Sequence, residues 1–83
     1  MIKETNEARK SYFNAIDRFS AVWDRACDQT IEAFDAWERE NAGDLTAINY
    51  LQDQAIVAAI ADNYTEAAAR MNEAAAILED CVA

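Results

Sequence analysis

Apolar and small side chains recur along residues 5–42 at alternating intervals of four and three. This spacing is typical of the packed seam of an α-helix. No proline or glycine interrupts the segment, and a parallel row of small and aromatic residues widens its apolar face. We therefore expect one long helix over residues 5–42. Its seam consists of Tyr12, Ile16, Phe19, Trp23, Ala26, Thr30, Ala33 and Trp37.

Two shorter helices are expected after the stretch Asn41-Ala42-Gly43, which makes a good helix stop because the only glycine is available for a left-handed cap. Asp44 is the expected N-cap of a helix over residues 45–61, whose run 55–61 is apolar on all sides. Residues 62–64 are expected to turn, and residues 65–82 to form a third helix with one apolar seam. The prediction is a single all-α domain over residues 1–83, built from a long N-terminal helix and a helical hairpin.

The unequal helix lengths leave an apolar surface to be covered. A continuous first helix would be about 55 Å long, and each helix of the hairpin about 26 Å. A hairpin folded onto residues 24–41 leaves the N-terminal half exposed, unless the helix breaks near residues 20–28 to give a four-helix bundle. Because that stretch has no proline, glycine or strong cap, we favour a dimeric helical bundle. The expected homodimer interface includes Tyr12, Phe13, Ile16, Phe19 and Trp23.

The net charge of −9 is unevenly spread along the chain. Residues 1–39 hold six basic and eight acidic side chains, whereas residues 40–83 hold one basic and eight acidic side chains. A surface of this kind repels nucleic acid and anionic membranes, and it attracts basic partners.

Five acids lie on one side of the expected first helix, within an arc of about 80° opposite the seam. Neighbours four residues apart lie about 6 Å from each other, close to the spacing of phosphates along a nucleic-acid strand. This acidic row therefore predicts a nucleic-acid mimic that binds its partner through Asp17, Asp24, Asp28, Glu32 and Asp35. The alternative is an ordinary solvated helix face whose acids pair with Arg18 and Arg25.

Residue types that carry catalysis or metal binding are scarce. Histidine is absent, Cys27 and Cys81 are far apart in the sequence, and no glycine-rich phosphate loop is present. We therefore expect no enzyme, no catalytic residues, no metal and no cofactor. No segment reaches the roughly 20 apolar residues of a membrane span, and the first residues are polar, so we expect a cytoplasmic protein with reduced thiols.

Charge and size together favour a non-enzymatic protein-interaction module. We expect a stoichiometric inhibitor that occupies a basic, nucleic-acid-binding surface of a partner protein, without contacting nucleic acid or membrane itself. In size and charge the chain resembles phage-encoded inhibitors such as anti-CRISPR proteins, although no motif accompanies this likeness. The alternative is a helical assembly or adaptor subunit that acts through its apolar helix stripe, with the charge serving solubility. Binding through the acidic row would weaken steeply with salt, whereas binding through the stripe would not.

Overall fold

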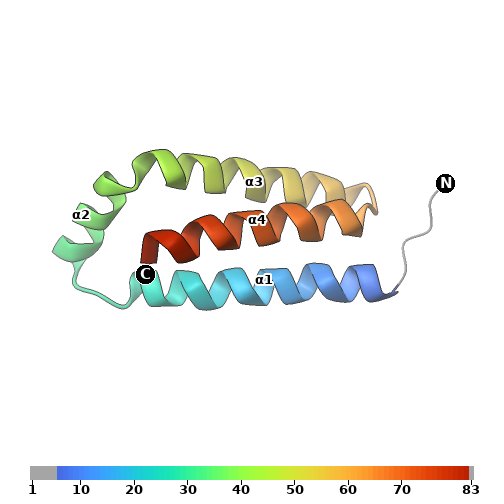
Figure 1. The fold of residues 1–83 in the computed structure, drawn as a ribbon, viewed down its shortest axis with the longest axis horizontal. Helices are drawn as coiled ribbons and strands as arrows, with labels where there is room; N and C mark the ends of the chain where they lie inside the picture. The colour runs from blue at the N-terminus through green and yellow to red at the C-terminus, as the bar shows by residue number, and fades with distance from the viewer. Residues whose placement is uncertain (1–5, 83) are drawn as a thin grey trace.

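The structure, a computed structural model, describes residues 6–82. The all-helical class is confirmed, but the expected count of three helices is wrong, because the described residues form four helices and no strand. The molecule is elongated, with extents of 48 × 19 × 17 Å (Figure 1). The helices are α1 (Asn6–Cys27), α2 (Ile31–Glu40), α3 (Ala42–Ile60) and α4 (Tyr64–Val82).

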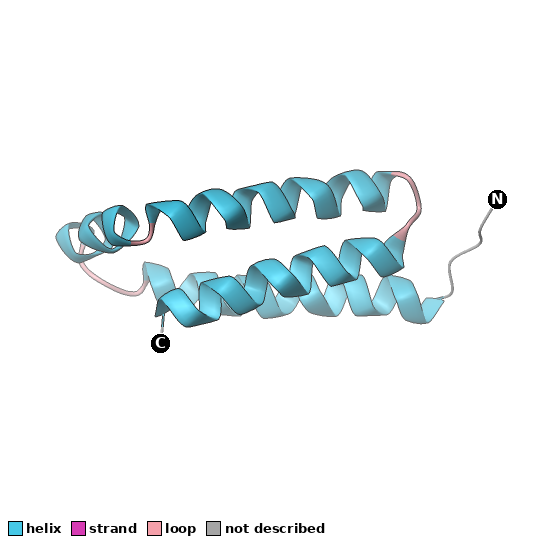
Figure 2. Ribbon diagram, turned by 45° about the horizontal axis from the view of Figure 1, so that its top comes forward, coloured by secondary structure: helices cyan, strands magenta, loops and turns pink. Residues whose placement is uncertain are grey.

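The C-terminal helix α4 holds the bundle together. It packs along both α1 and α3, whereas the backbones of α1 and α3 barely approach each other within the described residues. Figure 1 shows α4 running parallel to α1 and antiparallel to α3, while α2 crosses the end where α1 and α3 are connected. Figure 2 shows the same three long helices lengthwise, with α2 at the end where α1 and α3 are connected.

The first helix ends at Cys27, so the expected continuous helix over residues 5–42 is wrong. Polar side chains on both sides of the break supply the hydrogen bonds that a continuing helix would have made. Gln29 Nε2 donates to the carbonyl oxygen of Ala26 at 2.6 Å. Thr30 Oγ1 accepts a hydrogen bond from the backbone N–H of Ala33 at 3.2 Å, which makes Thr30 the N-cap of α2.

A helix does stop at the expected residues 41–43, since α2 ends at Glu40 with Asn41 as its C-cap, but the expected N-cap at Asp44 is wrong. The third helix already begins at Ala42, and Gly43 and Asp44 lie in its first turn. No described glycine has a positive φ, so Gly43 provides no left-handed cap. Only Asn41 separates α2 from α3.

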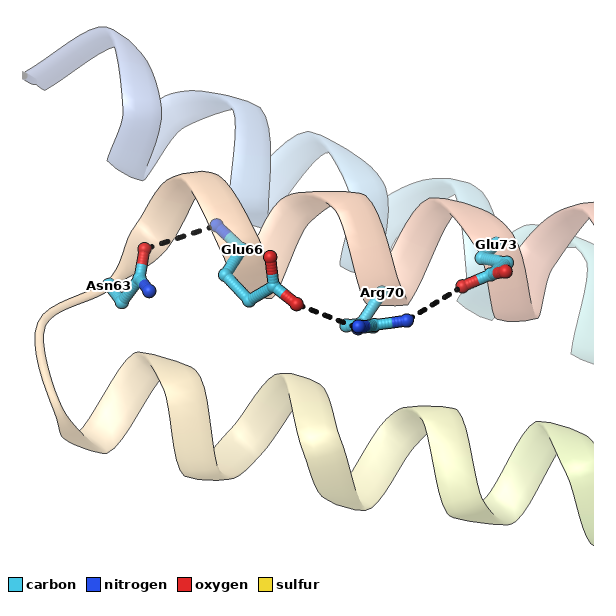
Figure 3. Close-up of polar contacts among 4 residues, drawn as sticks. All are labelled: Asn63, Glu66, Arg70 and Glu73. Carbon is cyan, nitrogen blue, oxygen red and sulfur yellow. Dashed lines mark hydrogen bonds and ion pairs between the residues drawn. The ribbon is translucent and has the colours of Figure 1, made fainter.

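The turn between α3 and α4 lies where the sequence places it. Asp62 adopts a left-handed conformation with φ of 60°, which its short polar side chain tolerates. Asn63 Oδ1 then accepts a hydrogen bond from the backbone N–H of Glu66 at 3.3 Å, which caps α4 (Figure 3). The hairpin of α3 and α4 is therefore closed by local polar contacts.

Small side chains let α4 approach its two neighbours closely. Ala67, Ala74 and Ala75 are fully buried, and Leu78 is the largest fully buried side chain of α4. The buried residues form two clusters along the bundle. One contains Tyr12, Ala15, Ala55, Ala67, Ala68 and Met71, and the other contains Val22, Ile48, Leu51, Ala74 and Leu78.

The break in the first helix also alters the case for a dimer. Because α4 lies along α1 from Tyr12 onward, Tyr12 is only 8% exposed and its ring lies 5.8 Å from that of Tyr64. Ile16 and Phe19 are half-buried. Of the five expected interface residues, only Phe13 and Trp23 are still exposed, at 53% and 36%. The homodimer stays a prediction, with a smaller uncovered surface to motivate it.

We predict that Thr30→Ala destabilises the protein by about 1 kcal/mol, because it removes the side-chain cap of α2 and favours an uninterrupted helix. Urea unfolding measures the change. Thr46→Ala is the matched control, since Thr46 Oγ1 donates to the carbonyl oxygen of Ala42 on an exposed helix face and caps nothing. An equal loss of stability in the two variants would contradict the capping role of Thr30.

We predict that Ala74→Leu destabilises the protein by about 1–3 kcal/mol, because a larger side chain in the close-packed seam forces α4 away from its neighbours. Ala76→Leu adds the same atoms at an exposed position of the same helix and should leave stability nearly unchanged. Thermal unfolding of both variants tests the seam. Similar melting temperatures for the two variants would show that α4 is not closely packed.

Candidate protein-interaction site

The helix break divides the acidic row between two helices. Asp17 and Asp24 lie on α1, Asp28 lies in the connection, and Glu32 and Asp35 lie on α2. All five side chains are exposed. Figure 1 shows α2 turning away from the axis of α1, so the acidic row does not follow one straight helix. Their role in binding a partner stays a prediction.

Arg18, one of the two cations next to the acidic row, pairs with residues of α4. Arg18 Nε donates to Glu79 Oε2 at 3.1 Å, and Arg18 Nη1 donates to Asn72 Oδ1 at 3.1 Å. These contacts tie α1 to α4. The ion pairs among residues 6–82 join Arg18 to Glu79 and Arg70 to Glu66 and Glu73, so none includes a member of the row.

These ion pairs shift the pKa values of the residues that form them. The hydrogen bond from Arg18 lowers the pKa of Glu79, and Arg18 and Arg25 add attraction through space. The same hydrogen bond raises the pKa of Arg18. On α4, the hydrogen bond to Glu66 raises the pKa of Arg70, which also reaches Glu73 (Figure 3). Arg18 and Arg70 are therefore committed to carboxylates of α4, which leaves the charge of the row unscreened by them.

A groove of about 460 Å³ opens between α1 and α3, beside the acidic row. The side chain of Met71 on α4 lies between its two walls. Its apolar lining also includes Ile16, Phe19 and Trp23 from α1 and Leu45 and Ile48 from α3. Polar residues also line it, among them Asp24 and Glu38. The groove thus combines an apolar lining with negative charge.

The short helix α2 is held against the end of the bundle by Trp37. Its indole Nε1 donates to the carbonyl oxygen of Cys81 at 2.8 Å, which satisfies one of the free carbonyls at the end of α4. The rings of Trp23, Phe34 and Trp37 contact one another, with centroids 5.5–6.2 Å apart. This aromatic cluster fixes Trp23 at the groove and places Glu38 on its lining.

Both cysteines are free thiols. Burial raises the pKa of Cys81, and the hydrogen bond from its Sγ to Asp44 Oδ2, at 3.6 Å, raises it further. A thiol that keeps its proton is a poor nucleophile. Within residues 6–82, no group of three or more acids or cysteines is arranged to hold a metal ion.

The structure separates the five expected interface residues into three environments. Ile16, Phe19 and Trp23 line the groove, Tyr12 belongs to the core, and Phe13 is exposed. Sequence reasoning missed Glu38 as a groove residue, because its position depends on how α2 crosses the bundle. It also missed Trp37 as the residue that docks α2, although its indole N–H needed a partner once the ring was assigned to the seam.

Comparison with known proteins identifies no relative: no family model, curated protein or solved structure matches the chain. None of the described helices is both long and apolar enough to span a membrane. The interaction surfaces must therefore be interpreted from their own residues.

We predict that Glu79→Gln destabilises the protein at neutral pH and has a smaller effect at an acidic pH below 4.5. The pKa of Glu79 is lowered in the folded state from its usual 4.5. The stability that the ionised Glu79 adds is therefore fully present above pH 4.5 and is lost as the pH falls through the folded-state pKa. Urea midpoints of the variant and the parent protein at the two pH values measure the difference. If the urea midpoints of variant and parent differ as much in acid as at neutral pH, Glu79 acts through packing.

Proposed function

We propose that this chain is a non-enzymatic binding protein that occupies the basic, nucleic-acid-binding surface of another protein and blocks it stoichiometrically. The supporting observation is the exposure of all five carboxylates of the acidic row, none of which takes part in an ion pair among the described residues. A net charge of −9 on 83 residues adds long-range attraction toward a cationic surface. The proposal implies a cytoplasmic partner that handles nucleic acid.

The corner between α1 and α2 gives this proposal its geometry. A straight row would follow one phosphate strand, whereas carboxylates on two crossing helices fit a basic surface that curves around the end of the bundle. Short-range pairing would follow the electrostatic encounter, and it would displace the bound ions and water from the partner's lysines and arginines. Nucleic acid would then compete directly with this protein for the same side chains.

A second candidate function is a helical assembly or adaptor subunit that acts through apolar surface. The groove between α1 and α3 favours it, as does the exposure of Phe13, Ile56, Val57 and Ile60. The predicted homodimer belongs to this alternative, because Ile16, Phe19 and Trp23 of the expected interface line the groove. The two functions differ in salt dependence, since apolar association is nearly insensitive to ionic strength while exposed charge pairs are screened.

We predict that the triple variant Asp24→Asn, Asp28→Asn, Glu32→Gln retains the fold and loses affinity for a basic partner by about tenfold or more. A partner is captured from a cell lysate at low salt, and its affinity is then measured with and without competing duplex DNA. The matched control, Glu7→Gln, Asp53→Asn, Asp62→Asn, removes three charges at exposed positions away from the row. The control should bind almost as well as the parent protein.

Two results would contradict the proposed function. If the control variant loses as much affinity as the triple variant, then net charge matters and the acidic row does not. If DNA does not compete with this protein for the partner, the surface that it covers is not the nucleic-acid site. Retention of full affinity at high salt would favour the adaptor function.

A further inference from the structure

The bundle has room for one more long helix. The backbones of α1 and α3 hardly meet within residues 6–82, although both pack on α4. The groove lies in the space between them, and Met71 of α4 lies on its lining. In a four-helix bundle a fourth helix fills this position, but α2 crosses the end of the molecule and does not occupy it (Figure 1).

The two walls of the groove have the spacing that a docked helix requires. On α3, Leu45, Asn49 and Gln52 line the groove, and Ile56, four residues further on the same face, is 48% exposed. On α1, Trp23, Ser20 and Ile16 line it, and Phe13, three residues before Ile16, is 53% exposed. The exposed side chains of Phe13 and Ile56 continue the two walls beyond the groove lining, and with them each wall is about 15 Å long, which corresponds to about three turns of a helix.

The negative charge on the groove lining favours a positively charged occupant. Asp24 and Glu38 lie on the lining, and neither takes part in an ion pair among the described residues. A docked segment would remove part of the water around these carboxylates, which is unfavourable unless the segment supplies cations. A second copy of this chain suits the site poorly, because its net charge is −9 and its last 44 residues hold one basic side chain, Arg70.

We propose that the groove between α1 and α3 binds one amphipathic α-helix of a partner protein, about three turns long, with an apolar face flanked by lysine or arginine. The apolar face lies against Phe19, Trp23 and Met71, and a flanking cation lies against Asp24 and Glu38. This inference goes beyond the proposed function, because it concerns the groove, which shares only Asp24 with the acidic row.

A synthetic peptide tests the groove directly. The probe is a helical peptide of about 16 residues with leucine at helical spacing and lysine on both flanks. We expect it to bind and to shift the tryptophan fluorescence, because Trp23 is 36% exposed at the groove. Two matched peptides should not bind: one with the same composition in scrambled order, and one with glutamate in place of lysine.

Two pairs of variants locate the binding site. Asn49→Lys places a cation on the groove lining and should lower the affinity for the lysine peptide by about tenfold or more. Asn14→Lys is the control, because it makes the same change at an exposed position outside the lining. Glu38→Gln should weaken binding, and Glu40→Gln on the same helix should not. Circular dichroism confirms that each variant is folded before the peptide is added.

The possible outcomes divide clearly. Equal binding of the ordered and scrambled lysine peptides would overturn the proposal, because it would show non-specific attraction between opposite charges. The proposal would also be overturned if the protein without peptide sediments as a dimer and the Asn49→Lys variant sediments as a monomer. The occupant of the groove would then be a second copy of the chain. The variants at Glu38 and Asn49 test the groove apart from the acidic row, because neither residue belongs to the row and Asp24, which belongs to both surfaces, is left unchanged.

Discussion

The end of α1 at Cys27 determines the rest of the architecture, because a helix continuing to Asn41 would leave the hairpin too short to cover it. The connection over residues 28–30 turns the chain instead, so that α3 runs back and α4 then packs along α1 from Tyr12 to Val22. The hydrogen bonds from Gln29 and to Thr30 satisfy groups that the break would leave without partners. A few polar contacts at one connection thus decide which apolar residues are buried.

The break makes α4 the central helix, and its composition suits that position. Alanine at Ala67, Ala74 and Ala75 allows two helices to approach it, whereas larger side chains would allow close contact with only one. A domain of this size buries little surface, so close packing over the whole length of α4 matters more than it would in a larger protein. The ion pair of Arg18 with Glu79 adds a link between α1 and α4 at the exposed edge.

The two helices of the hairpin were predicted well from the sequence, because local helix propensity decides where they form. The helices expected over residues 45–61 and 65–82 correspond to α3 and α4 within a few residues, because alanine-rich segments without breakers form helices. The missed break at residues 28–30 had a visible signal: Asp28, Gln29 and Thr30 are followed by Glu32 in the first turn of the next helix. The apolar seam continues through this stretch with unbroken spacing, and that periodicity concealed the cap.

The candidate surfaces could be predicted only in part, since they combine residues from several helices. Exposure of the acidic row followed from its position opposite the seam, but its bend at Asp28 depended on the break. The groove has no sequence signal of its own, because its lining comes from all four helices and Glu38 reaches it only through the docking of Trp37 at the end of α4.

Asp24 belongs to both the acidic row and the groove, and this overlap limits what any one substitution can show. A partner that reaches Asp24 approaches both surfaces, so a loss of binding in Asp24→Asn alone would fit either function. Glu32 belongs only to the row and Glu38 only to the groove, although both lie on the single short helix α2. These two carboxylates therefore separate a partner held by surface charge from one seated between α1 and α3.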